Sequence, residues 1–74
     1  MEEFEVLELI DKFVDEDTEL DDLIWVEDGR IIATNEETLG KMINELQIGN
    51  PTIFIKRFHP GYMEVAIDIP VFIG

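Results

Sequence analysis

The sequence predicts an α+β two-layer sandwich, in which two helices cover one face of a four-stranded antiparallel sheet. Apolar residues recur at helical spacing in two segments, and four further segments are short runs of β-branched, aromatic or alternating residues. Strong turn signals join those four strands into two hairpins, which gives the order α-β-β-α-β-β. An isolated hairpin is not stable, so we expect the two hairpins to pair with each other or across a dimer. With 74 residues, we expect a single domain over 1–74.

Residues 1 to about 15 have the pattern of an amphipathic helix. Its apolar stripe repeats at i, i+3, i+4 and i+7, and consists of Val6, Leu9, Ile10 and Phe13. The opposite arc is acidic and consists of Glu5, Glu8, Asp11, Asp15 and Glu16. The acids at 15–17 face the negative pole of the helix, so we expect the last turn to fray.

The first hairpin follows an acidic connector over residues 15–22. Residues 23–26 form a short apolar strand, and Asp28-Gly29 is typical of a two-residue type I′ turn. This turn predicts a register that pairs Glu27 with Arg30, Val26 with Ile31, Trp25 with Ile32, and Ile24 with Ala33.

Residues 34–47 are predicted to form the second helix. Thr34 and Glu37 have the spacing of a capping box, and Gly49 is expected to supply the C-terminal cap. The apolar stripe consists of Leu39, Met42, Ile43 and Leu46. Gly40 lies inside this helix, and our interpretation is that it permits close packing.

The second hairpin joins strands 52–58 and 62–69 around His59-Pro60-Gly61. A two-residue loop places Phe54 and Phe58 across from the core positions of the second strand. A three-residue loop places Ile53 and Ile55 there and sets Lys56 opposite Glu64, and the sequence leaves both registers open.

Two apolar surfaces remain without a partner in this scheme. The sheet face away from the helices keeps Trp25 and Ile32, together with either Phe54 and Phe58 or Ile53 and Ile55. The C-terminal segment Val71-Phe72-Ile73 must dock on this domain or on a second subunit.

The charge is very unevenly distributed. Residues 2–28 hold 13 of the 18 carboxylates and a single base, Lys12, which gives a net charge of −12 out of −13 for the chain. Such a surface repels nucleic acid and anionic membranes, because phosphate binding needs Lys and Arg. It favours a basic protein surface instead.

No catalytic, metal or cofactor motif stands out, so we expect a protein that is not an enzyme and needs no cofactor. The acidic run lacks the glycine that a calcium loop needs at its sixth position, where Leu20 or Asp22 stands instead. The chain has neither serine nor cysteine to form a nucleophilic pair with its one histidine. His59 is therefore interpreted as a turn residue at the hairpin tip.

We therefore expect a small cytoplasmic interaction protein that occupies the basic surface of a nucleic-acid-binding partner, as a nucleic-acid mimic, inhibitor or immunity protein does. The expected contact residues are the acids of the first helix and connector with one nearby aromatic: Glu5, Glu8, Asp11, Asp15, Glu16, Asp17, Glu19, Asp21, Asp22 and Trp25. The alternative is an assembly subunit that forms a homodimer through the open sheet face and the C-terminal tail, with the acid serving only solubility.

Overall fold

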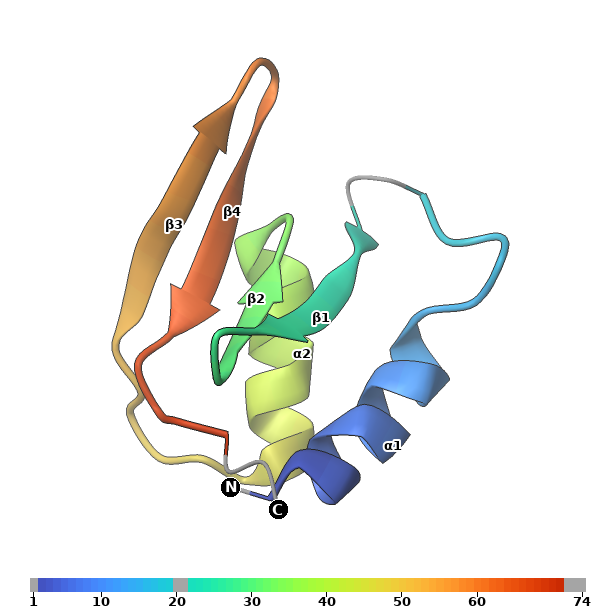
Figure 1. Ribbon diagram of the computed structural model, residues 1–74, viewed down its shortest axis with the longest axis vertical. Helices are drawn as coiled ribbons and strands as arrows, with labels where there is room; N and C mark the ends of the chain where they lie inside the picture. The colour runs from blue at the N-terminus through green and yellow to red at the C-terminus, as the bar shows by residue number, and fades with distance from the viewer. Residues whose placement is uncertain (1, 20–21, 72–74) are drawn as a thin grey trace.

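The structure, a computed structural model, describes residues 2–19 and 22–71 and has the predicted α+β fold (Figure 1). Its elements are α1 (Glu3–Phe13), β1 (Ile24–Glu27), β2 (Arg30–Ala33), α2 (Glu36–Leu46), β3 (Ile53–His59) and β4 (Tyr62–Ile67). The four strands form one antiparallel sheet in the order β1-β2-β4-β3, so β1 and β3 are its edges. The two hairpins thus pair with each other through β2 and β4.

Both helices pack on the same face of the sheet. The helical side chains Val6, Leu39 and Met42 are fully buried. They pack against sheet residues of alternating position: Ile24, Ile31, Ala33, Val65 and Ile67. The core lies in this single layer, as the alternation of apolar residues predicts.

The first hairpin has the predicted register and turn. Trp25 faces Ile32, and Asp28 and Gly29 have φ values of 53° and 73°, as a type I′ turn requires. The backbone N–H of Val71 donates to the carbonyl of Gly29 over 2.8 Å, and the Val71 side chain is buried in the core. The start of the C-terminal segment therefore docks on this domain, while Phe72 and Ile73 lie outside the described residues.

The ends of the helices differ from the prediction. Helix α2 is capped by Asn35, whose Oδ1 accepts from the N–H of Thr38 over 2.7 Å, so the predicted Thr34–Glu37 capping box is wrong. The Thr34 hydroxyl instead accepts from the N–H of Leu23, the residue before β1. A side chain that can also bond across the sheet is drawn away from the cap.

Two predictions about glycines in this region are also wrong. Helix α2 ends with Gln47 in the left-handed conformation, two residues before the glycine that was expected to cap it. Gly40 is exposed, and a Cβ built there meets no atom within 4 Å, so this glycine does not serve close packing.

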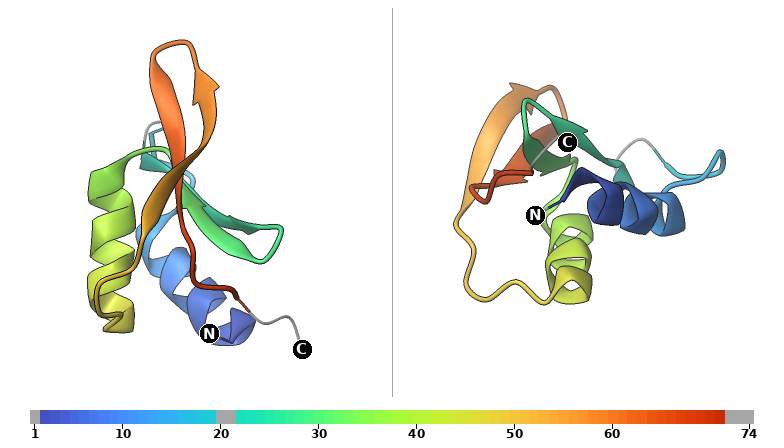
Figure 2. Two further views of the ribbon diagram at one scale, coloured as in Figure 1. Left: turned by 90° about the vertical axis from the view of Figure 1, so that its left-hand side faces the viewer. Right: turned by 60° about the horizontal axis from the view of Figure 1, so that its bottom comes forward.

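The β3–β4 hairpin combines both registers that the sequence left open. Near the two-residue Pro60-Gly61 turn, Phe58 faces Met63, whereas further down Ile55 faces Val65. A bulge at Lys56 joins the two registers, so Arg57 rather than Lys56 faces Glu64. The tip of this hairpin extends beyond the helices as an arm (Figure 2).

The sheet is rolled toward the face that carries no helix. Lys56 of β3 pairs with Asp28 at 3.6 Å, and Arg57 pairs with Glu27, so side chains link the two edge strands. Ile32 and Ala66, on this outer face, have no exposed surface. The expected open apolar face is thus mostly closed by the curvature of the sheet.

Candidate functional site

The predicted contact residues of α1 and the connector form one exposed acidic surface. We use this name for the exposed carboxylates Glu5, Glu8, Asp11, Asp15, Glu16, Asp17, Glu19 and Asp22. Helix α1 and the connector, which carry these acids, lie on the side of the molecule opposite β3 (Figure 1). Asp21 lies outside the described residues. The acids that the sequence singles out are therefore on one side of the fold.

The basic residues do little to neutralise this surface. Lys41 pairs with Glu37 at 3.8 Å, Lys56 with Asp28, and Arg57 with Glu27 and Glu64. Within residues 2–19 and 22–71, no ion pair reaches the acidic surface, although Lys12 stands in the same helix. Three of the five bases pair elsewhere in the fold, and these exposed carboxylates have no described ion pair to offset their charge.

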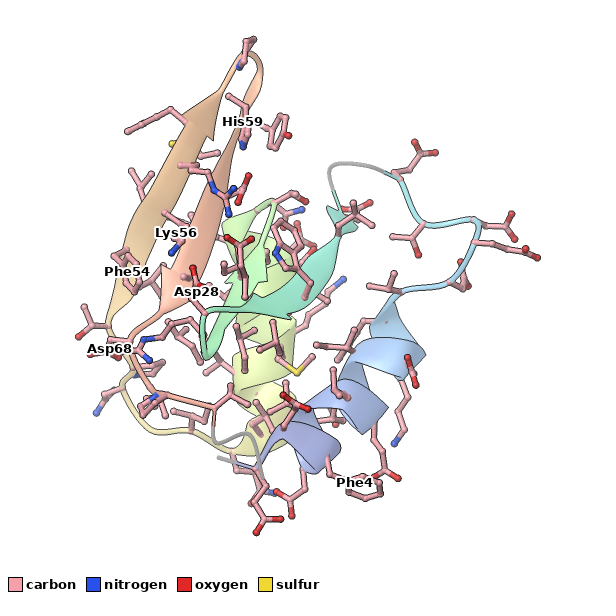
Figure 3. All side chains as sticks on the ribbon, viewed as in Figure 1. Phe4, Asp28, Phe54, Lys56, His59 and Asp68 are labelled. Carbon is pink, nitrogen blue, oxygen red and sulfur yellow. The ribbon has the colours of Figure 1, made fainter. Side chains whose placement is uncertain are left out.

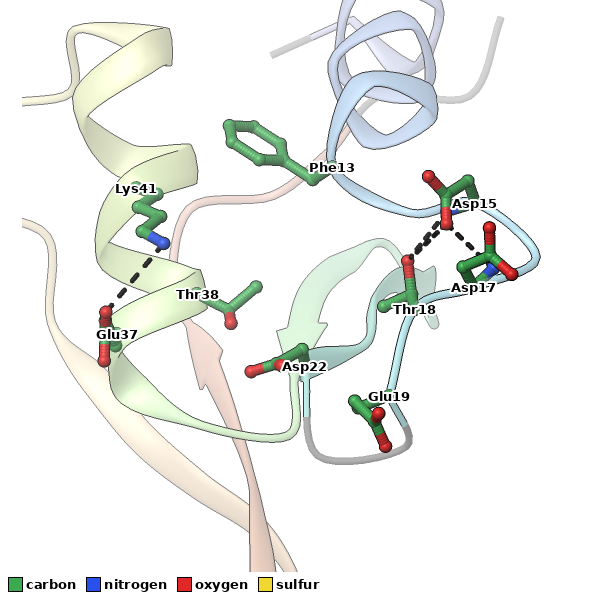
Figure 4. A pocket seen from close by; sticks show the side chains of 9 residues that line it. All are labelled: Phe13, Asp15, Asp17, Thr18, Glu19, Asp22, Glu37, Thr38 and Lys41. Carbon is green, nitrogen blue, oxygen red and sulfur yellow. Dashed lines mark hydrogen bonds and ion pairs between the residues drawn. The ribbon is translucent and has the colours of Figure 1, made fainter.

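An open hollow of about 560 Å³ lies between the end of α1, the connector and the start of α2 (Figure 4). Its lining combines acids of the connector with residues of both helices: Phe13, Asp15, Asp17, Thr18, Glu19, Asp22, Glu37, Thr38 and Lys41. The Lys41 ammonium lies on the α2 side, paired with Glu37. The hollow is thus a concave acidic surface with one cation at its border.

Local hydrogen bonds order the connector. Asp15 Oδ1 accepts from the N–H of Asp17 over 2.8 Å, and the Thr18 hydroxyl accepts from the N–H of Asp15 over 2.8 Å. Asp22 Oδ1 accepts from the side-chain amide of Asn35 over 3.2 Å, which ties the end of the connector to the cap of α2. These bonds fix the side chains of Asp15 and Asp22, whereas those of Glu16, Asp17 and Glu19 make no described hydrogen bond.

The acidic surface has no arrangement that holds a metal ion. In the described part of the chain, no three acidic or histidine side chains converge as metal ligands do. The carboxylates of the acidic surface are exposed to solvent.

Trp25 lies apart from the acidic hollow, in a polar cluster on the outer face of the sheet. Its indole N–H donates to Glu27 Oε1 over 3.2 Å. This bond, followed by the nearby Arg57 guanidinium, holds the pKa of Glu27 below its ordinary value, although desolvation opposes the shift. Trp25 is half-buried, so the structure does not bring it together with the acids that line the hollow.

The rest of this cluster surrounds Glu64, whose carboxylate is almost completely buried. Glu64 Oε1 lies 3.1 Å from Arg57 Nε, and Oε2 contacts His59 Nε2. His59 is the last residue of β3 rather than a turn residue, and its ring stacks on Tyr62 with centroids 4.4 Å apart (Figure 3). The sequence contains one signal for this cluster, the alternation that puts Tyr62, Glu64 and Ala66 on one face of β4.

No protein-family model, curated protein or solved structure matches this chain. Over the described residues, neither helix has the length and apolar character needed to cross a lipid bilayer. The geometry of the molecule is therefore the basis for a functional proposal.

Proposed function

We propose that this chain is a non-enzymatic interaction protein of the cytoplasm, whose acidic surface occupies the basic, nucleic-acid-binding surface of a partner protein. The observation that carries the proposal is the row of exposed carboxylates on α1 and the connector without an ion pair to the described bases. A folded domain of this size gains nothing in stability from such self-repulsion. A role in recognition explains why the charge is concentrated on one side.

The spacing of the carboxylates supports a nucleic-acid mimic. Glu5, Glu8 and Asp11 follow each other at three-residue steps in sequence, a rise of about 4.5 Å per step along the helix axis. Phosphates of one DNA strand follow at about 3.4 Å along the duplex axis. Lysines and arginines that bind successive phosphates can therefore contact carboxylates that follow each other at a similar spacing along the helix axis.

Exposed apolar side chains beside the acids supply the short-range part of the contact. Phe4 and Leu7, also on α1, are 69% and 43% exposed. The carboxylates speed the encounter with a basic partner, and burial of an aromatic side chain then slows dissociation.

The test is affinity capture from a cell lysate with two matched variants. The first, Glu16→Gln/Asp17→Asn/Glu19→Gln, removes three connector charges whose side chains make no described hydrogen bond. The control, Glu36→Gln/Glu45→Gln/Asp68→Asn, removes three exposed charges from other elements. Both variants have the same net charge, so a difference between them reports the position of the acids and not their number.

The expected result is a basic protein that the native chain and the control retain and the connector variant loses. Raising the salt concentration should release it, and added duplex DNA should compete with this chain for it. A partner that is retained equally by both variants, or that DNA does not displace, would show that the acidic surface is not a nucleic-acid mimic.

The alternative proposal is an assembly subunit that dimerises through the outer sheet face and the C-terminal tail. Ile32 and Ala66 on the outer sheet face, and Val71 at the start of the tail, are buried within one chain, so these three residues offer almost no apolar surface to a second copy. We therefore favour the acidic surface as the partner site.

A further inference from the structure

Strand β3 is an edge of the sheet that no described segment covers. Ile53, Phe54 and Ile55 are 40%, 38% and 46% exposed, and Phe58 is 75% exposed. A long, apolar edge strand is a template for pairing with another strand, and folded proteins usually protect such edges with charge, proline or a covering segment. The bulge at Lys56 protects only the half of β3 that leads to the arm tip.

The backbone groups of Ile53 and Ile55 point toward the free side. The N–H of Asp68 donates to the carbonyl of Thr52 over 3.1 Å, so these two residues form a hydrogen-bonded pair between the strands. In an antiparallel ladder such pairs alternate with pairs whose N–H and C=O groups point outward. Ile53 and Ile55, which face Ile67 and Val65, are therefore the residues with unpaired outward groups.

We propose that β3 is the interface for a second copy of this chain, through an antiparallel β3–β3 pair with its two-fold axis at Phe54. Ile53 of one copy then lies opposite Ile55 of the other, which satisfies the outward backbone groups of both. The two Phe54 rings meet on the outer face, and the two four-stranded sheets become one continuous sheet. The contact is self-complementary, as a two-fold interface must be.

Charge indicates a second copy as the occupant. Residues 53–59 contain no acid, and their two bases, Lys56 and Arg57, are paired within the domain. A basic partner is attracted to the opposite side of the molecule, where the acidic surface lies. A second copy, which carries the same charge of −13, can approach only where acid is absent.

The size of the molecule limits the electrostatic repulsion between two copies joined at β3. Its principal extents are 33 × 27 × 21 Å, and β3 and the connector lie on opposite sides. Two chains joined at β3 thus keep their acidic surfaces further apart than the Debye length of about 8 Å at physiological salt. The acidic surface also remains free to bind its own partner.

The available area predicts a weak dimer. The exposed parts of Ile53, Phe54 and Ile55 amount to roughly 250 Å² per copy, from side chains of about 200 Å² each. Two copies thus offer roughly 500 Å² before the edge backbone is counted, about half of the ~1,000 Å² typical of a specific interface. We therefore expect a weak dimer that forms only at high protein concentration.

Analytical ultracentrifugation of the full chain over a range of concentrations tests this proposal. Phe54→Lys removes the aromatic contact and sets two lysines opposite each other at the two-fold axis, while the net charge of each chain becomes less negative, so the long-range repulsion between chains does not increase. Ile55→Pro removes an outward N–H without taking a hydrogen bond from the β3–β4 ladder. Phe4→Lys is the matched control, an equal substitution at an exposed aromatic of α1. Circular dichroism checks that each variant is folded.

We expect both β3 variants to raise the dissociation constant at least about tenfold, while Phe4→Lys leaves it unchanged. Below physiological salt, added salt should strengthen the dimer, because it screens repulsion between two acidic chains, whereas salt weakens binding of a basic partner. This opposite salt dependence separates the two proposals, so either can fail alone. A chain that stays monomeric, or a dimer that persists in folded β3 variants, would overturn the β3 interface.

Discussion

The pairing of Glu64 with Arg57 gives a quantitative test of how the rolled sheet is held together. The Glu64 side chain is 7% exposed, whereas that of Arg57 is 46% exposed and also pairs with Glu27. Arg57→Met therefore leaves a buried carboxylate with His59 as its remaining side-chain partner among the described residues. Glu64→Leu leaves an arginine that is half in solvent and still paired with Glu27.

The two single substitutions should differ in their effect on the free energy of unfolding. Removing one member of a fully buried ion pair costs about 3–5 kcal/mol. Because Arg57 is half-exposed and water screens the pair, we expect a loss of roughly 2 kcal/mol for Arg57→Met. Glu64→Leu should cost less than about 1 kcal/mol, and the double variant should recover at least about half of the Arg57→Met loss.

Urea denaturation of the wild type, both single variants and the double variant measures these differences as a double-mutant cycle. A loss of about 2 kcal/mol corresponds to a fall in Tm of roughly 8–16 °C for a domain of this size. Equal effects of the two single substitutions would refute the argument, since it depends on the unequal burial of the partners. A double variant as unstable as Arg57→Met would refute it as well.

Four further substitutions test other features of the fold. Gly40→Ala should stabilise the protein by up to about 1 kcal/mol in thermal denaturation, because Gly40 is exposed in a helix. Gly29→Ala should instead destabilise it, because Gly29 has a φ of 73°. A loss of stability in Gly40→Ala would mean that this glycine has a packing role. Asn35→Ala should lower the free energy of unfolding by about 1 kcal/mol, because it removes the capping hydrogen bond to Thr38. An unchanged denaturation midpoint would show that Asn35 does not stabilise the helix as its cap. Glu27→Gln should reduce the dependence of stability on pH. A carboxyl with a lowered pKa contributes stability above its ordinary value of 4.5 and loses it as the pH falls through the folded-state pKa, so parallel pH curves for the two proteins would contradict the shift.

The acidic surface and the β3 edge depend on different properties of the chain. The first is a feature of composition, and it acts at long range through charge. The second depends on which backbone groups point outward, and it acts only on contact. Since they lie on opposite sides of the molecule, a dimer would present two acidic surfaces to its partners.

The alternation of apolar residues and the turn chemistry determined most of the architecture. Asp28-Gly29 specifies its own turn and therefore the register of β1 and β2, because few residues tolerate positive φ at both positions. The two apolar stripes determine which helix faces are buried, since burial of apolar surface is the dominant favourable term in folding. The concentration of acid at the N-terminal end is likewise a property of the sequence alone.

Only the tertiary structure decided the features that depend on distant pairs. The bulge at Lys56 reconciles two registers that local pattern could not distinguish, and it turns Arg57 toward Glu64. Asn35 becomes the helix cap because Thr34 bonds to Leu23, a competition between neighbours that spacing cannot reveal. The periodicity of apolar residues predicts which side chains are buried, whereas the curvature of the sheet decides which side chains from distant strands contact each other.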